Sequence, residues 1–138
     1  MTKKTFFYLI NGKSMIPFLR SKDIGIFERV FDIDLFSVYL FNAGKAKKPA
    51  VHRLVRIDKK KLFFHGDNAA SFFECGGEFL AVPKKEIKGK LVKIIRHGKK
   101  IEGSKFRILS GLSLIYSSVK VLPFLIKKIL NKSFRKKQ

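Results

Sequence analysis

Short apolar segments separated by turn signals fill the first hundred residues, and this spacing constrains the fold most. The segments are rich in β-branched and aromatic residues, and Gly, Pro, Asn or Asp ends most of them. Short strands punctuated in this way are typical of an all-β barrel or sandwich. No helix alternates with them, so a mostly β domain is predicted rather than a parallel α/β fold. The expected strands are 6–10, 24–30, 33–41, 51–57, 61–65, 78–82 and 89–96.

The composition changes at residues 103–104, which divides the chain into a β domain, 1–103, and a tail, 104–138. The tail contains no acidic residue, and its apolar residues recur in steps of three and four, as on one face of an α-helix. Ser104 is the expected N-cap, and Pro123 is expected to kink or split the helix. The apolar stripe consists of Ile108, Leu112, Ile115, Val119, Leu122, Ile126 and Ile129.

The sequence leaves three placements of this amphipathic helix open. A transmembrane span is disfavoured because the most apolar window, 106–126, contains Arg107, Lys120 and Pro123. Packing of the stripe on the β domain is the ordinary outcome for a surface helix. A helix lying in the headgroup region of an anionic membrane accounts for the stripe, the missing acids and the basic end together. This last placement predicts a peripheral membrane protein, on the cytoplasmic face because anionic lipids lie there.

The net charge of +21 calls for an anionic partner. Nucleic acid and anionic lipid both qualify. No recognisable nucleic-acid motif is present, and the phenylalanines pair in apolar runs such as Phe6-Phe7 and Phe63-Phe64 rather than between basic clusters. Nucleic acid is therefore the less favoured partner.

The sequence indicates neither a targeting segment at the N-terminal end nor a metal site. The apolar run 6–10 is too short for a signal-peptide core or a membrane anchor, so neither is expected at this end. The single cysteine, Cys75, cannot form an intrachain disulfide, and His52, His65 and His97 are far apart in sequence. No metal site and no cofactor are expected.

Ser14 is the candidate nucleophile. It follows Gly12 and precedes Pro17, which places a hydroxyl on a constrained bend. A serine needs a base to become nucleophilic, and His52 is the candidate because strand alternation puts it on the face opposite Val51 and Arg53. Asp67, on a turn after a strand, is a candidate to orient the histidine; an ordinary Asx turn is an equal alternative.

Four motifs in order resemble the type I signal peptidases and their relatives, from about residue 11 to about residue 95. They are Gly-Lys-Ser-Met-Ile-Pro at 12–17, Val-His-Arg-Leu-Val at 51–55, Gly-Asp-Asn at 66–68 and Ile-Lys-Gly-Lys-Leu-Val at 87–92. The resemblance implies a coiled, barrel-like β peptidase domain. It also implies a serine endopeptidase that cleaves signal or leader peptides with small residues before the cut.

The residue before Arg53 separates subfamilies. Bacterial-type enzymes have Lys there, whereas the endoplasmic-reticulum and archaeal types have His, so His52 is similar to the Ser–His branch. That branch has a second aspartate shortly after the Gly-Asp-Asn turn, where this chain has Phe73 followed by Glu74. The resemblance thus leaves three alternatives: Asp67 alone orients His52, Glu74 substitutes, or the triad is incomplete. It also implies that the backbone N–H of Ser14 serves the oxyanion hole, since Gly12 replaces an auxiliary serine of some relatives.

Two other functions remain from the sequence. A self-cleaving regulator like the SOS repressors needs a cleavable arm before Ser14, and almost no chain precedes it. A catalytically degenerate peptidase fold would act as a scaffold at a membrane surface or on nucleic acid, and the missing second aspartate favours this alternative.

Overall fold

The computed structural model describes residues 3–29, 32–68, 70 and 79–135. It contains an eight-stranded antiparallel sheet and a long C-terminal helix, which confirms the mostly β fold with a helical tail. The strands are β1 Thr5–Leu9, β2 Ile24–Glu28, β3 Val38–Ala43, β4 Lys48–Ile57, β5 Lys61–His65, β6 Leu80–Pro83, β7 Ile87–Arg96 and β8 Lys99–Ile101. A short 3-10 turn, η1 Lys84–Glu86, precedes β7, and the helix is α2, Gly103–Arg135.

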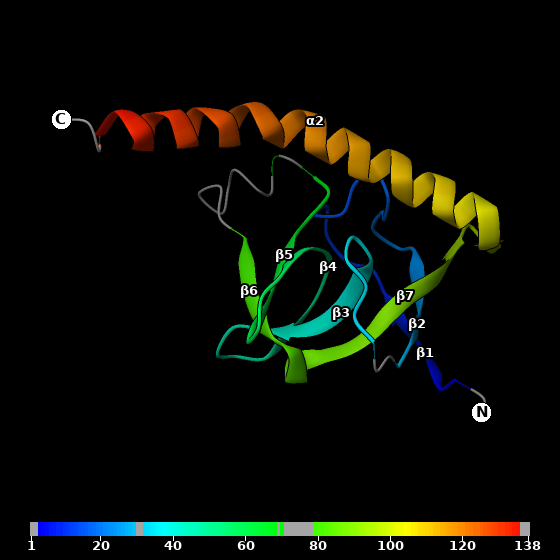
Figure 1. Cartoon of the computed structure of the whole chain (residues 1–138). Coiled ribbons are helices and arrows are strands. Elements are labelled where there is room, and N and C mark those ends of the chain that lie inside the picture. The colour runs from blue at the N-terminus through cyan, green and yellow to red at the C-terminus, as the bar shows by residue number, and fades with distance from the viewer. Residues whose placement is uncertain (1–2, 30–31, 69, 71–78, 136–138) are drawn as a thin grey trace.

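The sheet is coiled rather than flat (Figure 1). Its strand order is β1-β2-β7-β3-β4-β5-β6, with β8 paired to β7, and β1 and β6 are its ends among the described strands. Register shifts interrupt the ladders at Ile26/Phe27, Leu40/Phe41 and Leu54/Arg56. Such bulges bend and twist a strand, which explains how one sheet curls around two cores.

Strand β3 separates the two cores. Val38 and Leu40 face one cluster, whereas Tyr39 and Phe41 face the other. Because both faces of β3 are buried, its sequence is a continuous apolar run and not an alternating one. The strand begins at Val38 rather than near residue 33, because Phe36 has a φ of 65° and leaves the extended conformation. The sequence prediction also missed β8.

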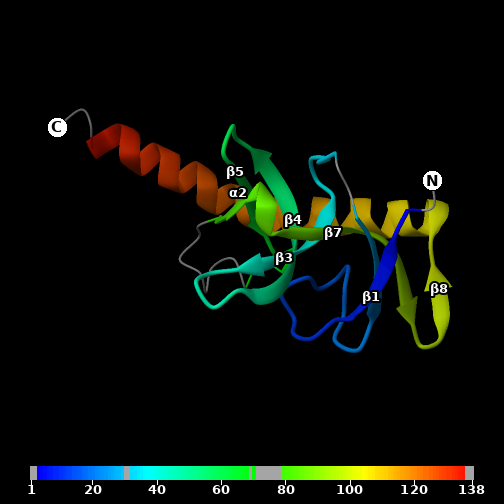
Figure 2. The same ribbon diagram turned by 90° about the horizontal axis from the view of Figure 1, so that it is seen from below.

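Helix α2 lies across one side of the sheet, and its C-terminal half extends past the strands (Figures 1 and 2). The helix is continuous through Pro123, so of the two expected alternatives, a kink or a split, the split does not occur. Pro123 lies on an exposed part of the helix, where water can reach the carbonyl that loses its hydrogen bond. The helix begins at Gly103, which places Ser104 in the first turn instead of at the N-cap.

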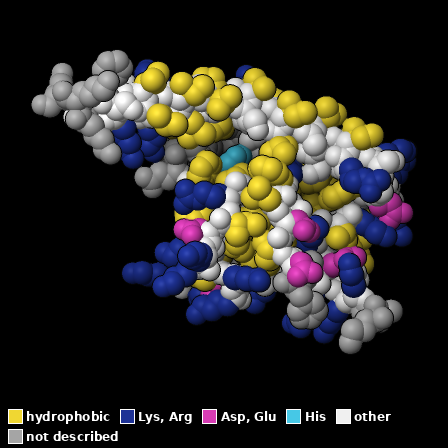
Figure 3. All heavy atoms as spheres, viewed as in Figure 1, with side chains coloured by type: hydrophobic (Ala, Val, Ile, Leu, Met, Phe, Trp, Pro, Cys, Tyr) yellow, Lys and Arg dark blue, Asp and Glu magenta, His cyan; other side chains and the backbone are white. Residues whose placement is uncertain are grey.

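The serine face of α2, not its apolar stripe, packs on the sheet. Ser113 and Ser117 are buried, and Phe106 packs against the first core. All seven residues of the stripe are exposed, from 49% for Ile126 to 64% for Val119 and Ile129. Figure 3 shows hydrophobic side chains along the side of α2 turned away from the sheet. Of the three placements that the sequence leaves open, packing of the stripe on the β domain is therefore wrong.

The opposite placement of the two faces follows from helix geometry. Residues two positions apart lie about 200° apart around a helix, so Ser113 and Ile115 point in opposite directions. Because Ser113 faces the sheet, the stripe must face away from it. Among the described residues, α2 is the one helix that is long and apolar enough to cross or associate with a membrane.

Candidate active site

The loop after β1 holds Ser14. The chain reverses at Gly12, whose φ of 94° suits glycine. Met15, Phe18 and Leu19 then enter the first core and are buried, which anchors the loop from its far side. Ser14 itself remains half-buried at the surface of the domain. Its side chain is thus presented by a loop that the core holds in place.

His52 approaches Ser14 from the middle of β4. It pairs with Tyr39 of β3, and its ring contacts Phe41 edge-on at 6.0 Å between centroids. Its Nε2 atom lies 3.2 Å from the Oγ atom of Ser14. In the tautomer with hydrogen on Nδ1, the Ser14 hydroxyl donates to Nε2. The structure thus brings together two predicted residues that are 38 positions apart in sequence.

The turn after β5 fixes the Ser14 loop from the other side. The backbone N–H of Asn68 donates to the Ser14 carbonyl at 2.9 Å, and its side-chain amide donates to the Lys13 carbonyl at 2.9 Å. Gly66 approaches so closely that a Cβ atom there would lie 2.2 Å from the Ser14 carbonyl oxygen. The Gly-Asp-Asn segment therefore clamps the backbone of the nucleophile.

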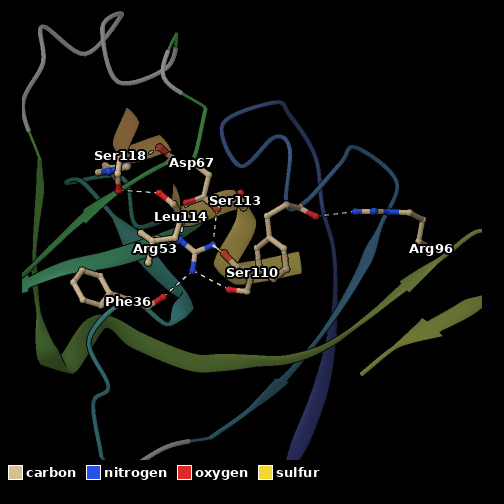
Figure 4. Close-up of polar contacts among 11 residues, drawn as sticks. Phe36, Arg53, Asp67, Arg96, Ser110, Ser113, Leu114 and Ser118 are labelled. Atoms are coloured by element: carbon tan, nitrogen blue, oxygen red, sulfur yellow. Dashed lines mark hydrogen bonds and ion pairs between the residues drawn. The ribbon is translucent and has the colours of Figure 1, made fainter. Parts of the chain in front are cut away.

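Asp67 holds Arg53 and does not hydrogen-bond to His52. Its two carboxylate oxygens accept from Nε and Nη2 of Arg53 at 2.7 and 2.6 Å, and Oδ2 also accepts from Ser113 at 2.6 Å (Figure 4). The expectation that Asp67 orients the imidazole is thus not met. The physical reason is that Arg53, buried on the opposite face of β4, competes for the same carboxylate. The alternative, an Asx turn, forms at Asn68 instead of Asp67, because the N–H of Ala70 donates to Oδ1 of Asn68.

Burial controls the protonation of His52. Burial, together with a smaller effect of nearby His65, lowers the pKa of His52 from 6.5 to about 4, and Asp67 opposes the shift. At neutral pH the imidazole is therefore uncharged, the form that a general base requires. Its Nδ1 atom is buried and has no hydrogen-bond partner among the described residues. Glu74, the predicted auxiliary acid, lies outside the described residues.

A cleft of about 180 Å³ opens beside the Ser14–His52 pair. Tyr8 and Ile10 line one wall, and Pro49, Ala50 and Val51 line the other. The backbone N–H of Ser14 donates no hydrogen bond to any described acceptor, so it is free for the predicted oxyanion role. Within the described ranges, no cluster of three or more His, Cys, Asp or Glu residues is placed to hold a metal ion.

Sequence reasoning missed three residues behind the pair: Arg53, Ser110 and Ser113. Arg53 is 1% exposed, and hydrogen bonds tie it to Asp67 and to Ser110 of α2. Two signals were present in the sequence. An arginine stands in an apolar strand beside Leu54, and serines recur in helical steps opposite the apolar stripe.

Comparison of this chain with protein-family models, with curated proteins and with solved structures finds no match.

Proposed function

We propose that this protein is a serine endopeptidase in which Ser14 is the nucleophile and His52 is the general base. The distance of 3.2 Å between Ser14 Oγ and His52 Nε2 carries the proposal, because it is within reach of direct proton transfer. The neutral state of His52 and the cleft beside the pair support it. The resemblance to signal peptidases supports it from the sequence.

The reaction uses the chain's own groups. Ser14 Oγ attacks the peptide carbonyl carbon while Nε2 of His52 takes the hydroxyl proton. The oxyanion is stabilised by the Ser14 N–H. The C–N bond then breaks, and the leaving amine receives the proton from Nε2. Water, deprotonated by His52, attacks the acyl ester and regenerates Ser14.

The two walls of the cleft suit an extended peptide. Strand β1 pairs only with β2, and residues 48–52 of β4 pair only with β3, among the described strands. Each wall therefore offers an unpaired strand edge to which a peptide can add as a further strand. The small volume, about 180 Å³, favours small side chains next to the scissile bond.

A second groove of about 410 Å³ continues the cleft and shares Tyr8 and Pro49 with it. Phe6 and Leu40 contribute its apolar surface. A peptide bound along β1 would pass from the cleft into this groove, so we assign the groove to an apolar side chain of the substrate. Three cations at the rim favour an acidic neighbour; they are Lys4, Arg29 and Lys88.

The enzyme is proposed to act at an anionic membrane surface, as on the cytoplasmic leaflet. The exposed stripe of α2 is an apolar surface with no partner in the described part of the chain. Lys105 and Arg107 lie on its two flanks, where their head groups reach lipid phosphates. A spanning orientation is less suitable, because α2 packs lengthwise on the β domain, where Ser113 and Ser117 are buried.

A catalytically inactive scaffold is the competing function. It is favoured by one observation, the Nδ1 atom of His52 without a described partner. The two functions differ in one measurable property: the peptidase cleaves peptides in a way that depends on Ser14, and the scaffold does not.

Cleavage of a leader-type peptide with small residues before the cut, followed by mass spectrometry of the products, tests the proposal. Wild type, Ser14→Ala and His52→Ala should be compared with Ser104→Ala, an exposed serine of α2. We expect cleavage by wild type and Ser104→Ala and none by the other two. Equal cleavage by Ser14→Ala would contradict the proposal. No cleavage by wild type would favour the scaffold.

A further inference from the structure

Helix α2 completes the hydrogen bonding of Arg53. Five hydrogen bonds leave the guanidinium: two to Asp67, one to the Phe36 carbonyl at 2.7 Å, and two to Ser110. The contacts to Ser110 join Nη1 to Oγ at 2.9 Å and Nη2 to the carbonyl at 3.4 Å. Arginine has five N–H donors, so all are satisfied only while α2 is in place.

The same helix supplies a donor to the partner of Arg53. The Ser113 hydroxyl donates to Oδ2 of Asp67 at 2.6 Å (Figure 4). Arg53, Asp67 and Ser113 are each at most 1% exposed, so water does not replace these bonds. The ion pair is thus enclosed jointly by the β domain and α2.

Each member of this ion pair is adjacent in sequence to the catalytic machinery. Arg53 follows His52 on β4. Asp67 lies between Gly66 and Asn68, the two residues that clamp the backbone of Ser14. A displacement of the ion pair is therefore transmitted to both His52 and the Ser14 loop, since each is reached through a directly adjacent residue.

We infer that Ser110 and Ser113 are positioning residues for the Ser14–His52 pair, and that α2 is part of the active-site architecture as well as a membrane anchor. The two serines act through Arg53 and Asp67 and contact neither reacting group. This inference rests on the proposed peptidase function and adds a requirement to it. Peptide turnover depends on the polar face of α2 even when no membrane is present.

The helix provides a matched control on the same face. Ser117 lies one turn after Ser113 and is 0% exposed, but its hydroxyl has no hydrogen-bond partner among the described residues. A change of Ser117 to alanine removes the same atom from an equally buried site without touching the ion pair. Any general effect of a buried alanine in α2 therefore appears in Ser113→Ala and in Ser117→Ala alike.

The test measures kcat and KM of the full chain on a short soluble peptide without vesicles, for wild type, Ser113→Ala, Ser110→Ala, Ser117→Ala and Ser113→Thr. We expect Ser113→Ala and Ser110→Ala to lower kcat by about 10- to 100-fold with little change in KM, the size of effect that misplacement of a catalytic group produces. We expect Ser117→Ala to retain kcat and Ser113→Thr, which keeps the hydroxyl, to recover most of it. Urea unfolding of each variant confirms that it is folded.

Unchanged kcat in Ser113→Ala, or an equal loss in Ser117→Ala, would overturn the inference. The NMR resonances of the His52 imidazole provide a readout that needs no turnover. They should shift in Ser113→Ala and stay in place in Ser117→Ala. If wild type proves inactive, the peptidase function fails, yet these resonances still decide whether α2 positions His52.

Discussion

Gly66 packs directly against the backbone of Ser14, at a distance where a Cβ atom would lie 2.2 Å from the Ser14 carbonyl oxygen. We expect Gly66→Ala to push the Ser14 loop away from His52 and to lower kcat/KM by about 100-fold, since the neighbouring atom is backbone and cannot rotate aside. Peptide cleavage assays measure this effect.

Gly111→Ala is the matched control for that prediction. Gly111 lies on the exposed side of α2, and an added Cβ meets nothing within 4 Å. We expect unchanged activity and a gain of about 0.5–1 kcal/mol in unfolding free energy, because alanine is the better helix former. Full activity in Gly66→Ala would contradict the clamp.

The pH profile should reflect the burial of His52. Since the pKa of His52 is lowered from 6.5 to about 4, we expect kcat/KM to stay constant from neutral pH to about pH 5 and to fall as His52 is protonated near pH 4. An acid limb near pH 6.5 would show a solvated imidazole and contradict this geometry.

The same shift predicts a loss of stability in acid. The unfolded chain protonates His52 below about pH 6.5, whereas the folded protein does so only near pH 4, so the unfolded state binds more protons in this window. The unfolding free energy should therefore decrease as the pH falls through it, by about 3 kcal/mol in total. Urea unfolding at about pH 6.5 and near pH 4 measures this change. The unfolding free energy should decrease less in His52→Gln than in wild type.

Arg53 should be among the most sensitive positions for stability. Arg53→Met leaves the carboxylate of Asp67 buried without its cation, and we expect a loss of about 3–5 kcal/mol in urea unfolding. The double variant Arg53→Met/Asp67→Leu should regain part of this loss, because no uncompensated charge remains. Lys93→Met, which breaks the exposed pair with Glu102, serves as control and should leave the midpoint unchanged. If Arg53→Met shifted the urea midpoint as little as Lys93→Met does, the stabilising role of the buried ion pair would be contradicted.

The exposed stripe of α2 should govern membrane binding separately from catalysis. Burial of one isoleucine is worth about 1.5–3 kcal/mol, so we expect Ile115→Glu to weaken binding to anionic vesicles by about 10- to 100-fold. Asn131→Glu makes the same charge change on the opposite side of α2 and should weaken binding less. Both variants should cleave a soluble peptide as wild type does. Equal vesicle binding by the two variants would exclude insertion of the stripe.

The sequence predicted the parts of this architecture that depend on local pattern. Strand β5 has the predicted bounds, Lys61–His65, because a short apolar run there ends at the Gly66 turn. Ser14 and His52 were predicted from motifs that place a hydroxyl on a bend and a base on a strand. Both signals require only the neighbouring residues.

Contacts between distant segments were not predictable in the same way. The sequence does not say which buried cation takes the carboxylate of Asp67, because Arg53 lies 14 positions away and only the fold brings the two together. The stripe that begins at Ile108 predicts a helix but not the direction in which it faces. Contacts between distant segments determine that the serine face turns inward: Ser110 and Ser113 hydrogen-bond to the ion pair, and Phe106 packs against the first core.

The most direct test of the central claim is covalent trapping of the nucleophile. Wild type, Ser14→Ala and His52→Ala are incubated with a peptide-based acylating probe, and intact mass and peptide mapping locate the adduct. We predict a single adduct on Ser14 of wild type and none on either variant. An adduct that persists in Ser14→Ala, or a wild type that forms none and leaves a leader peptide uncut, would contradict the assignment of Ser14 and His52 as a catalytic pair.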